Sequence, residues 1–491
     1  MENSQEPKKI IPQEYNMKCL PDSKLDIASA PIANPSNNDP IDVFSAILKK
    51  LKPIDFRAAG QLDPHDTLTS KNEVVIIIRQ ILEAAGELHL GLCSSEQQIH
   101  EYNGCFWNRV NGDEFQNFLA KASLQLGIDK LSASHHHFQE QLKKQFLSSA
   151  AQAFPSPNPG RTLINLRNGT FEIVGRRKIL REPRASDFLR YQLPFSYLPS
   201  ATCAQWNRFL DEVLPDNASQ DVLAEYFAYV LTDLQLQKVL FLYGSGANGK
   251  SVVSNVMSAI FGEENVSHYE LSQLGKETHL AMIADKLLNY SSELSRRFDQ
   301  ELFKKLACGE PVAVRHLYGH PYTMSRYGKL AFNCNALPRE NDQNEAFYRR
   351  LLPIPFPTSV PKDKRDTNLA KKIIENELPG VFNWVLMGLD RLIKNGEFSE
   401  CSESDQLLQD YRDNSDIVKE FLAEAGYQKT FQRSDFTTLQ MVYEDFATFC
   451  KKAGEQPIPR SAFRPRLEEN GLDCPKTKIG RIVLAKPRCK F

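Results

Sequence analysis

The sequence predicts a multidomain α/β protein, and three observations lead to this class. The chain has 491 residues, which corresponds to about three domains of ordinary size. Hydrophobic residues make up 41% of the chain and charged residues 25%, so each domain can bury a core. Between residues 238 and 395, short apolar runs typical of buried strands alternate with segments of helical spacing, which indicates a central α/β domain.

The segments on either side of this centre differ in composition. Six prolines among Ser, Asn and Lys leave residues 1–40 without an apolar period, whereas residues 41–51 have helical spacing. Hairpin patterns around Asn103-Gly104 and Asn168-Gly169 indicate a small α+β domain. The predicted parts are a flexible tail with one short helix (1–70), an N-terminal α+β domain (71–200), a helical collar (201–237), the central core (238–395), a linker (396–416) and a C-terminal domain (417–491).

Net charge, cysteine spacing and hydropathy exclude several classes of protein. The 60 Lys and Arg residues against 61 Asp and Glu give a net charge of −1, so the chain is not uniformly basic. None of the 10 cysteines lies in a CxxC pair, and the first residues lack the pattern of a signal peptide. The longest apolar stretches are far shorter than the roughly 18 residues of a membrane span. We therefore expect a cytoplasmic protein with free thiols and no membrane partner.

A run of three histidines, His135, His136 and His137, invites a metal-binding interpretation. Consecutive residues on a helix point in different directions, so three neighbours rarely bind one ion. We expect these residues on a surface helix instead.

The strongest functional signal is a glycine-rich octapeptide that matches GxxxxGK[ST] at every fixed position. It reads Gly244-Ser245-Gly246-Ala247-Asn248-Gly249-Lys250-Ser251. An apolar run precedes it, and residues 252–261 after it have helical spacing. Such a loop turns backbone N–H groups toward phosphates at a helix N-terminus, while the lysine reaches the β- and γ-phosphates and the hydroxyl binds Mg²⁺. The sequence therefore predicts a nucleoside triphosphate site in which Lys250 and Ser251 take these two roles.

Two later strand patterns each end in a polar residue. The run from Lys286 ends in Ser292-Glu293, and the run from Lys329 ends in Asn335. We predict that Glu293, on a strand next to the phosphate-loop strand, controls Mg²⁺ and the attacking water. We predict that Asn335 binds the γ-phosphate or orients that water. The alternatives are a solvated carboxylate at a strand end for Glu293 and an amide that caps a turn for Asn335.

Two arginines, Arg349 and Arg350, stand just before a further apolar strand pattern. A fixed arginine near a transferring phosphoryl group raises the rate by orders of magnitude. Either residue is therefore a candidate to act in a neighbouring subunit's site, and the alternative is a surface ion pair.

The order of these elements resembles superfamily 3 helicases, and more narrowly the poxvirus and satellite-phage primase-helicase branch found in phages, plasmids and mobile elements. The likeness covers about residues 100–490. The stretches that carry it are the 164–174 hairpin, the phosphate loop with its strand, 286–293, 302–318, 329–338 and 347–356. The ordered set of these stretches, with Gly-Glu-Pro-Val-Ala-Val-Arg at 309–315 and Asn-Ala-Leu-Pro at 335–338, is specific to this branch.

The resemblance implies an AAA+-type P-loop core that assembles as a ring, a homo-hexamer, with ATP between subunits. Single-stranded or forked DNA would thread the central channel during replication. Members of the branch also carry a primase domain, but here the preceding region is short and contains no paired Asp-x-Asp. We therefore carry over the helicase part alone and expect a separate primase or polymerase as partner.

Two regions are predicted to meet DNA. Residues 312–325 fit a hairpin between the two polar strand ends, where helicases of this class present a basic tip to the pore, and Lys304, Arg315 and His320 are the candidates. In the C-terminal domain, the order of helices and strand suits a winged helix. Residues 451–491 hold 11 Lys and Arg against four Asp and Glu, a net of +7. The alternative for both regions is solvated charge.

Two functions from different classes explain the phosphate loop. The first is an ATP-dependent DNA helicase of a mobile element. The second is a nucleic-acid-binding ATPase switch, such as a replication initiator or a defence sensor, which assembles but does not unwind. Duplex unwinding in the presence of ATP separates them.

Overall fold

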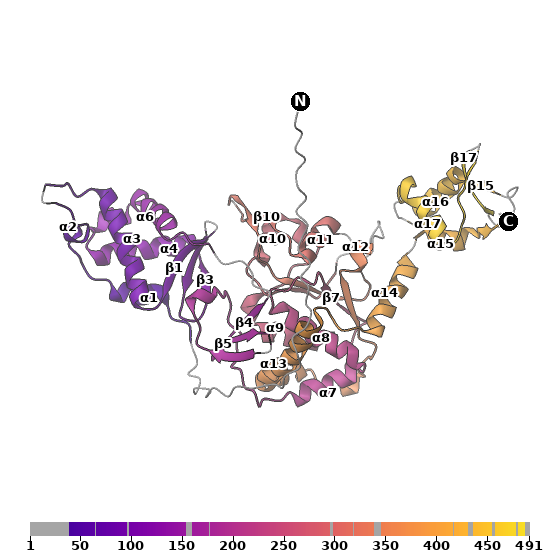
Figure 1. Ribbon diagram of the computed structural model, residues 1–491, viewed down its shortest axis with the longest axis horizontal. Coiled ribbons are helices and arrows are strands. Elements are labelled where there is room, and N and C mark those ends of the chain that lie inside the picture. The colour runs from indigo at the N-terminus through magenta and orange to yellow at the C-terminus, as the bar shows by residue number, and fades with distance from the viewer. Residues whose placement is uncertain are drawn as a thin grey trace, which may run out of the picture.

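The computed structural model describes residues 39–63, 65–95, 98–153, 160–175, 177–294, 298–317, 319–337, 345–415, 417–430, 436–453, 457–477 and 480–486. Residues 1–38 of the predicted tail lie outside these ranges, as do Tyr318 and Pro338, the last residues of two stretches that carry the family resemblance. Figure 1 shows the chain running from N-terminal helices on the left, through a large central part, to a small C-terminal unit on the right.

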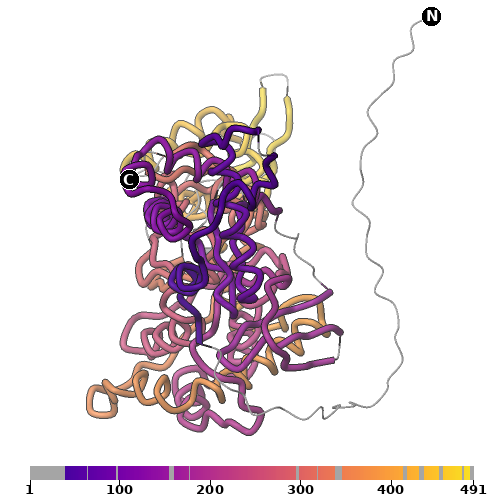
Figure 2. The backbone as a smooth tube through the Cα atoms, turned by 90° about the vertical axis from the view of Figure 1, so that its left-hand side faces the viewer, coloured from indigo at the N-terminus to yellow at the C-terminus, as the bar shows by residue number. Residues whose placement is uncertain are grey.

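The N-terminal unit packs helices against a small antiparallel sheet. Its main helices are α1 (Val43–Lys50), α3 (Ser70–Glu87), α4 (Gly112–Leu126) and α6 (His136–Ser149), with the short α2 (Phe56–Ala59) and α5 (Lys130–Ser134). The strands β1 (Gly91–Ser95), β2 (Gln98–Tyr102) and β3 (Trp107–Val110) pair in sequence order, which confirms the predicted hairpin at Asn103-Gly104. Helix α3 begins where the side chains of Thr69 and Asn72 cap each other's backbone N–H groups. In Figure 2 the indigo N-terminal helices lie in front of the rest of the molecule.

A second antiparallel sheet joins this unit to the centre. Its strands β4 (Arg161–Leu166), β5 (Gly169–Val174) and β6 (Arg177–Arg181) include the predicted hairpin at Asn168-Gly169. Apolar residues of β4 and β5 belong to the same buried cluster as the central helices, so this sheet packs with the centre and not with α3–α6.

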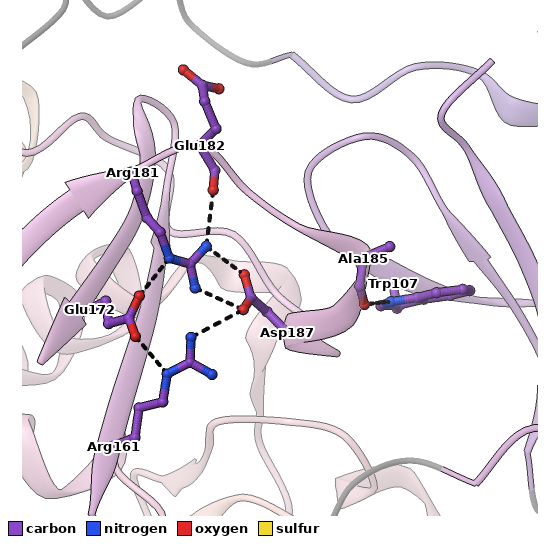
Figure 3. A network of polar contacts seen from close by, with 7 residues as sticks. All are labelled: Trp107, Arg161, Glu172, Arg181, Glu182, Ala185 and Asp187. Atoms are coloured by element: carbon purple, nitrogen blue, oxygen red, sulfur yellow. Dashed lines mark hydrogen bonds and ion pairs between the residues drawn. The ribbon is translucent and has the colours of Figure 1, made fainter. Parts of the chain in front are cut away.

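An ion-pair network holds the end of this sheet to the segment that follows (Figure 3). Arg161 and Arg181 both contact the Glu172 carboxylate, at 2.7 and 2.5 Å, and both contact Asp187 in the 3₁₀ turn η1 (Ala185–Asp187). The hydrogen bond from Arg161 is the main reason that the pKa of Glu172 falls to about 2. Beside the network, Trp107 Nε1 donates to the Ala185 carbonyl at 2.8 Å, which ties β3 to this segment.

The centre is a five-stranded parallel sheet in the order β13–β7–β12–β9–β8. The strands are β7 (Val239–Tyr243), β8 (Val266–Ser267), β9 (Leu288–Ser291), β12 (Lys329–Cys334) and β13 (Leu351–Pro355). Side chains alternate between the two faces. Leu240 and Leu242 face one buried cluster, and Val239 and Phe241 face another. The predicted α/β class with a parallel-sheet core is therefore confirmed.

Helices cover both faces of this sheet (Figure 1). One cluster holds residues of α7 (Ala204–Val213), α8 (Asn217–Val230), α9 (Lys250–Phe261) and α13 (Leu369–Asn395). The other holds residues of α10 (Glu277–Leu280), α11 (Gln300–Cys308) and α12 (Glu345–Tyr348). The predicted linker at 396–416 is largely the helix α14 (Ser402–Ser415), and Ser404 Oγ donates to the Pro353 carbonyl at 2.6 Å. Polar composition suggested a linker there, but the helix lies against β13.

Two further pieces complete the fold. A hairpin of β10 (Val312–Arg315) and β11 (Pro321–Met324) is inserted between β9 and β12, as predicted. The C-terminal unit has its own core and contains α15 (Ile417–Ala425), α16 (Leu439–Ala453), α17 (Arg460–Glu469) and the short strands β14 (Gln428–Lys429), β15 (Thr437–Thr438), β16 (Lys476–Thr477), β17 (Gly480–Val483) and β18 (Ala485–Lys486).

Candidate functional site

The glycine-rich octapeptide forms the turn from β7 into α9. Helix α9 begins at Lys250, and the residues Gly246, Ala247 and Gly249 before it have positive φ angles of 110°, 55° and 84°. Gly249 also lies in a crowded place, because an added Cβ would stand 2.9 Å from the Phe209 ring and from Val213 Cγ1. Both constraints favour glycine at this position. The strand–loop–helix arrangement is the one that turns backbone N–H groups toward an anion.

Lys250 lies inside this turn. Its side chain is buried, and Nζ donates to the Gly244 carbonyl at 2.7 Å and to Asn248 Oδ1 at 2.8 Å. Burial lowers the pKa of Lys250 from its ordinary value, because desolvation disfavours the charged form. The ammonium group is therefore held by two neutral acceptors, which the stronger acceptor oxygens of a phosphate could replace. Ser251 is exposed in the first turn of α9.

The other polar strand ends lie at the same edge of the sheet. Carboxyl ends of parallel strands meet at one edge, and Cys334 on β12 is in register with Tyr243 on β7. Asn335 follows Cys334 and is exposed, and the N–H of Gly244 donates to the Cys334 carbonyl at 3.1 Å. The loop is thus tied directly to the strand that carries Asn335.

Glu293 lies at this edge but one strand further away. It follows β9 and is exposed, and Ser291 Oγ accepts from its N–H at 3.3 Å and donates to its carbonyl at 2.9 Å. We expected the Glu293 strand to neighbour the phosphate-loop strand, and this was wrong. Strand β12 lies between β9 and β7, so Asn335 is on the nearer strand.

Two residues near this edge carry oxygen donors of the kind that magnesium prefers. Mg²⁺ in nucleotide sites is held by one or two protein oxygens together with phosphate oxygens, and Ser251 and Glu293 offer a hydroxyl and a carboxylate. Within the described ranges no three His, Cys, Asp or Glu residues converge as an all-protein metal site. His135, His136 and His137 are exposed at the start of α6, in agreement with the predicted surface helix.

The structure separates the two candidate arginines. Arg350 is 6% exposed, donates to the Ala346 carbonyl and contacts Cys308 Sγ at 3.0 Å, so its side chain joins α12 to α11 inside the protein. Arg349 is exposed. Only Arg349 therefore has a side chain that faces outward.

The predicted DNA contacts occupy two elements. Arg315 and His320 belong to the exposed part of the β10–β11 hairpin, and Arg315 pairs with Glu277 at 3.0 Å. Lys304 lies instead on α11, 3.4 Å from Glu301, with a side chain that is 18% exposed. The sequence did not single out His316, whose Nε2 lies 2.9 Å from the Arg109 guanidinium of β3 and 3.2 Å from the Tyr322 hydroxyl.

The basic residues of the C-terminal unit are partly paired. Arg464 and Arg466 lie 3.7 and 3.6 Å from Glu468 and Glu469, and Arg460 stacks over the Tyr443 ring at 4.9 Å. Lys476 and Arg481 are exposed on the β16–β17 hairpin. Among the described helices of the whole chain, none has the length and apolar character that a membrane crossing requires.

Comparisons with known proteins match two parts of the chain. Residues 88–215 match the family "D5 N terminal like", and residues 242–350 match a "Family of unknown function (DUF5906)". A protein of Acanthamoeba polyphaga mimivirus named "Putative helicase L207/L206" is 24% identical over 234 residues, which are 43% of this chain and 23% of the viral protein. The chain thus spans less than a quarter of that relative's length.

Two apo structures of the NrS-1 C-terminal region resemble the fold at 10% identity. Each similarity covers 82% of this chain, with 97% and 98% of the solved chains and a TM-score of 0.47.

Proposed function

We propose that this chain is the motor of an ATP-dependent DNA helicase that acts in the replication of a phage, plasmid or other mobile element. One observation carries the proposal: the phosphate loop, Asn335 and Glu293 lie at a single edge of one parallel sheet. The partial matches to a D5-type family and to a mimiviral protein named as a helicase support it.

In this proposal the residues of the sheet edge divide the work on the triphosphate. The loop from Gly244 to Gly249 and the start of α9 bind the phosphates, and Lys250 exchanges its contacts with Gly244 and Asn248 for phosphate oxygens. Ser251 and Glu293 would hold Mg²⁺, which neutralises the developing charge. Glu293 orients the attacking water, and Asn335 donates its amide to the terminal phosphate.

Strand movement in this proposal depends on surfaces outside that edge. Arg349, which faces outward, reaches the nucleotide of the next subunit in a homo-hexameric ring. Arg315 and His320 on the exposed hairpin contact single-stranded DNA, and Lys304 on α11 adds a further contact. The basic C-terminal unit contacts the phosphate backbone of DNA. A separate primase or polymerase carries out the synthesis of new strands.

The experiment measures ATP hydrolysis and displacement of a strand from forked DNA by the full chain. Glu293→Gln should keep ATP binding and lose hydrolysis, because the amide neither holds Mg²⁺ as a charge nor accepts a proton from water. Lys250→Ala should lose both ATP binding and ATP hydrolysis. The matched control is Glu263→Gln, which replaces an exposed carboxylate in the turn η2 (Glu263–Asn265) at the opposite end of the sheet. This variant should keep ATP hydrolysis and strand displacement unchanged.

Two outcomes would contradict the proposal at different levels. Hydrolysis by Glu293→Gln at the rate of the unaltered chain would remove Glu293 from the site. Hydrolysis without strand displacement, under conditions in which rings form by native mass spectrometry, would favour an ATPase switch over a helicase.

A further inference from the structure

A ten-residue segment after β13, residues 356–365, lies along one side of the phosphate loop, and we refer to it as the strap. Its first residue is bonded to the end of β7, because Phe356 N–H donates to the Tyr243 carbonyl at 2.8 Å. Asn248 Nδ2 then donates to the Phe356 carbonyl at 3.1 Å, and Val360 N–H donates to the Ala247 carbonyl at 2.9 Å. Three hydrogen bonds therefore join the strap to β7 and the loop.

The strap lies on the side of the loop away from the proposed chemistry. The order β13–β7–β12–β9 places the strap, which continues β13, on one side of β7, and it places Asn335 and Glu293 on the other. The proposed function requires the terminal phosphate to face Asn335 and Glu293. A nucleotide that spans the loop must then direct its ribose and base toward the strap.

The exposed groups of the strap suit that end of a nucleotide. Val360 is half-buried and packs partly on the core, and Pro357 is exposed, so these two residues leave some apolar surface next to the loop, beside the exposed hydroxyl of Ser359. Arg365 Nε donates to the Val360 carbonyl at 2.8 Å and closes the turn formed by η5 (Lys362–Lys364). Nucleoside sites combine such apolar contacts with a few placed polar groups.

We infer that the strap is the wall that binds the nucleoside end of the substrate, with Val360 as an apolar contact and Arg365 as a positioning residue that holds Val360 in place. This inference rests on the proposed function, because it takes the direction of the bound nucleotide from Asn335 and Glu293. It adds a specificity-determining surface that the phosphate-loop motif does not contain.

The test compares ligands that share phosphates but differ in the nucleoside. Calorimetry with the full chain and Mg²⁺ should show that Val360→Ser weakens binding of ADP and ATP about tenfold, while binding of inorganic triphosphate stays unchanged. Arg365→Ala should show the same discrimination, and Arg365→Lys, which keeps a donor, should restore binding. Lys371→Ala, which removes an exposed cation on α13 outside the strap, is the matched control and should bind all three ligands normally.

A second measurement uses the unaltered chain and so does not depend on how the variants fold. Photolabelling with 8-azido-ATP should modify residues within 356–365, and excess ATP should prevent it. Equal weakening of triphosphate and nucleotide by Val360→Ser, no weakening at all, or photolabel confined to other segments would each overturn the inference. Failure of the unaltered chain to bind any of the ligands would overturn the proposed function together with it.

Discussion

The phosphate loop and the β10–β11 hairpin are held in place by different kinds of contact. The loop is fixed by bonds among buried or main-chain groups, such as Gly244 N–H to the Cys334 carbonyl and Lys250 Nζ to Asn248. Beyond Val314, the hairpin contacts the rest of the protein through surface side chains, such as Arg315 with Glu277 and His316 with Arg109. The Arg315 and Glu277 side chains are 56% and 59% exposed, and such pairs contribute about 1 kcal/mol at most.

This difference indicates how the two surfaces would work. A loop fixed by its own backbone presents its N–H groups in one arrangement before a nucleotide arrives, which lowers the cost of binding. In the proposed function, the hairpin would exchange Glu277 for a phosphate of DNA at low cost, because both partners of its ion pair already contact water. The proposed motor would then combine a preformed nucleotide site with an adjustable DNA surface.

The largest expected effect is the loss of ATP hydrolysis when the exposed Arg349 is replaced, which contrasts with a loss of stability when the buried Arg350 is replaced. Arg349→Ala should stay folded and assembled yet lose about 1,000-fold or more in hydrolysis, because a missing arginine in trans leaves transition-state charge uncompensated. Mixing it with Lys250→Ala should restore some hydrolysis, since one type of interface then joins an intact loop to an intact arginine. Arg350→Ala should instead lower the thermal unfolding temperature. No recovery in mixed rings confirmed by native mass spectrometry would remove Arg349 from this role.

A smaller effect is expected from disturbing the rigid loop. Gly249→Ala should destabilise the protein by about 2 kcal/mol or more, because alanine at φ 84° is strained and its Cβ would crowd Phe209. Hydrolysis should fall with it. Gly275→Ala is the control, since a Cβ there meets no atom within 4 Å. Chemical denaturation measures both changes, and equal stability of the two variants would show that the loop is less constrained than its geometry indicates.

Breaking the hairpin contact should leave stability unchanged and alter function. Arg315→Ala removes only an exposed ion pair, so the unfolding midpoint and the basal hydrolysis rate should match those of the unaltered chain. Stimulation of hydrolysis by single-stranded DNA should be lost, because a cation facing the strand is gone. Lys371→Ala, which breaks an exposed pair with Glu375 on α13, is the matched control. Normal stimulation of hydrolysis by DNA in Arg315→Ala would show that other residues make the DNA contact that drives this stimulation.

The smallest effect concerns the histidine that ties the hairpin to β3. Burial, and to a smaller degree the nearby Arg109 charge, lower the pKa of His316 from its ordinary value. A lowered pKa in the folded state means that His316 contributes stability above its unfolded pKa, and this stability is lost as pH falls through the folded value. Because Arg109→Ala removes one of the two causes of the lowered pKa, NMR titration should show a higher pKa for His316 in this variant than in the unaltered chain. An unchanged pKa would mean that the Arg109 contact does not form in solution.

Much of the fold was predictable because it depends on local patterns. Runs such as Val239–Tyr243 are apolar on both faces and identify strands buried in a parallel sheet, and Asn-Gly pairs identify the hairpins. The helix α14 was missed because its polar composition resembles a linker. Only its packing against β13 shows its place in the core.

For the candidate site, the sequence by itself determined the chemistry of the residues, and the tertiary structure decided their neighbours. The spacing of glycines and Lys250 predicts a phosphate loop because the motif is local and its geometry follows from φ angles that glycine tolerates. Strand order is not local, so the placement of β12 between β7 and β9 could not be predicted. The same holds for Arg350, which is buried against Cys308, and for the strap, which reaches the loop only because β13 pairs with β7. Contacts between distant segments arise when the whole core is buried, and no pattern within a few residues encodes them.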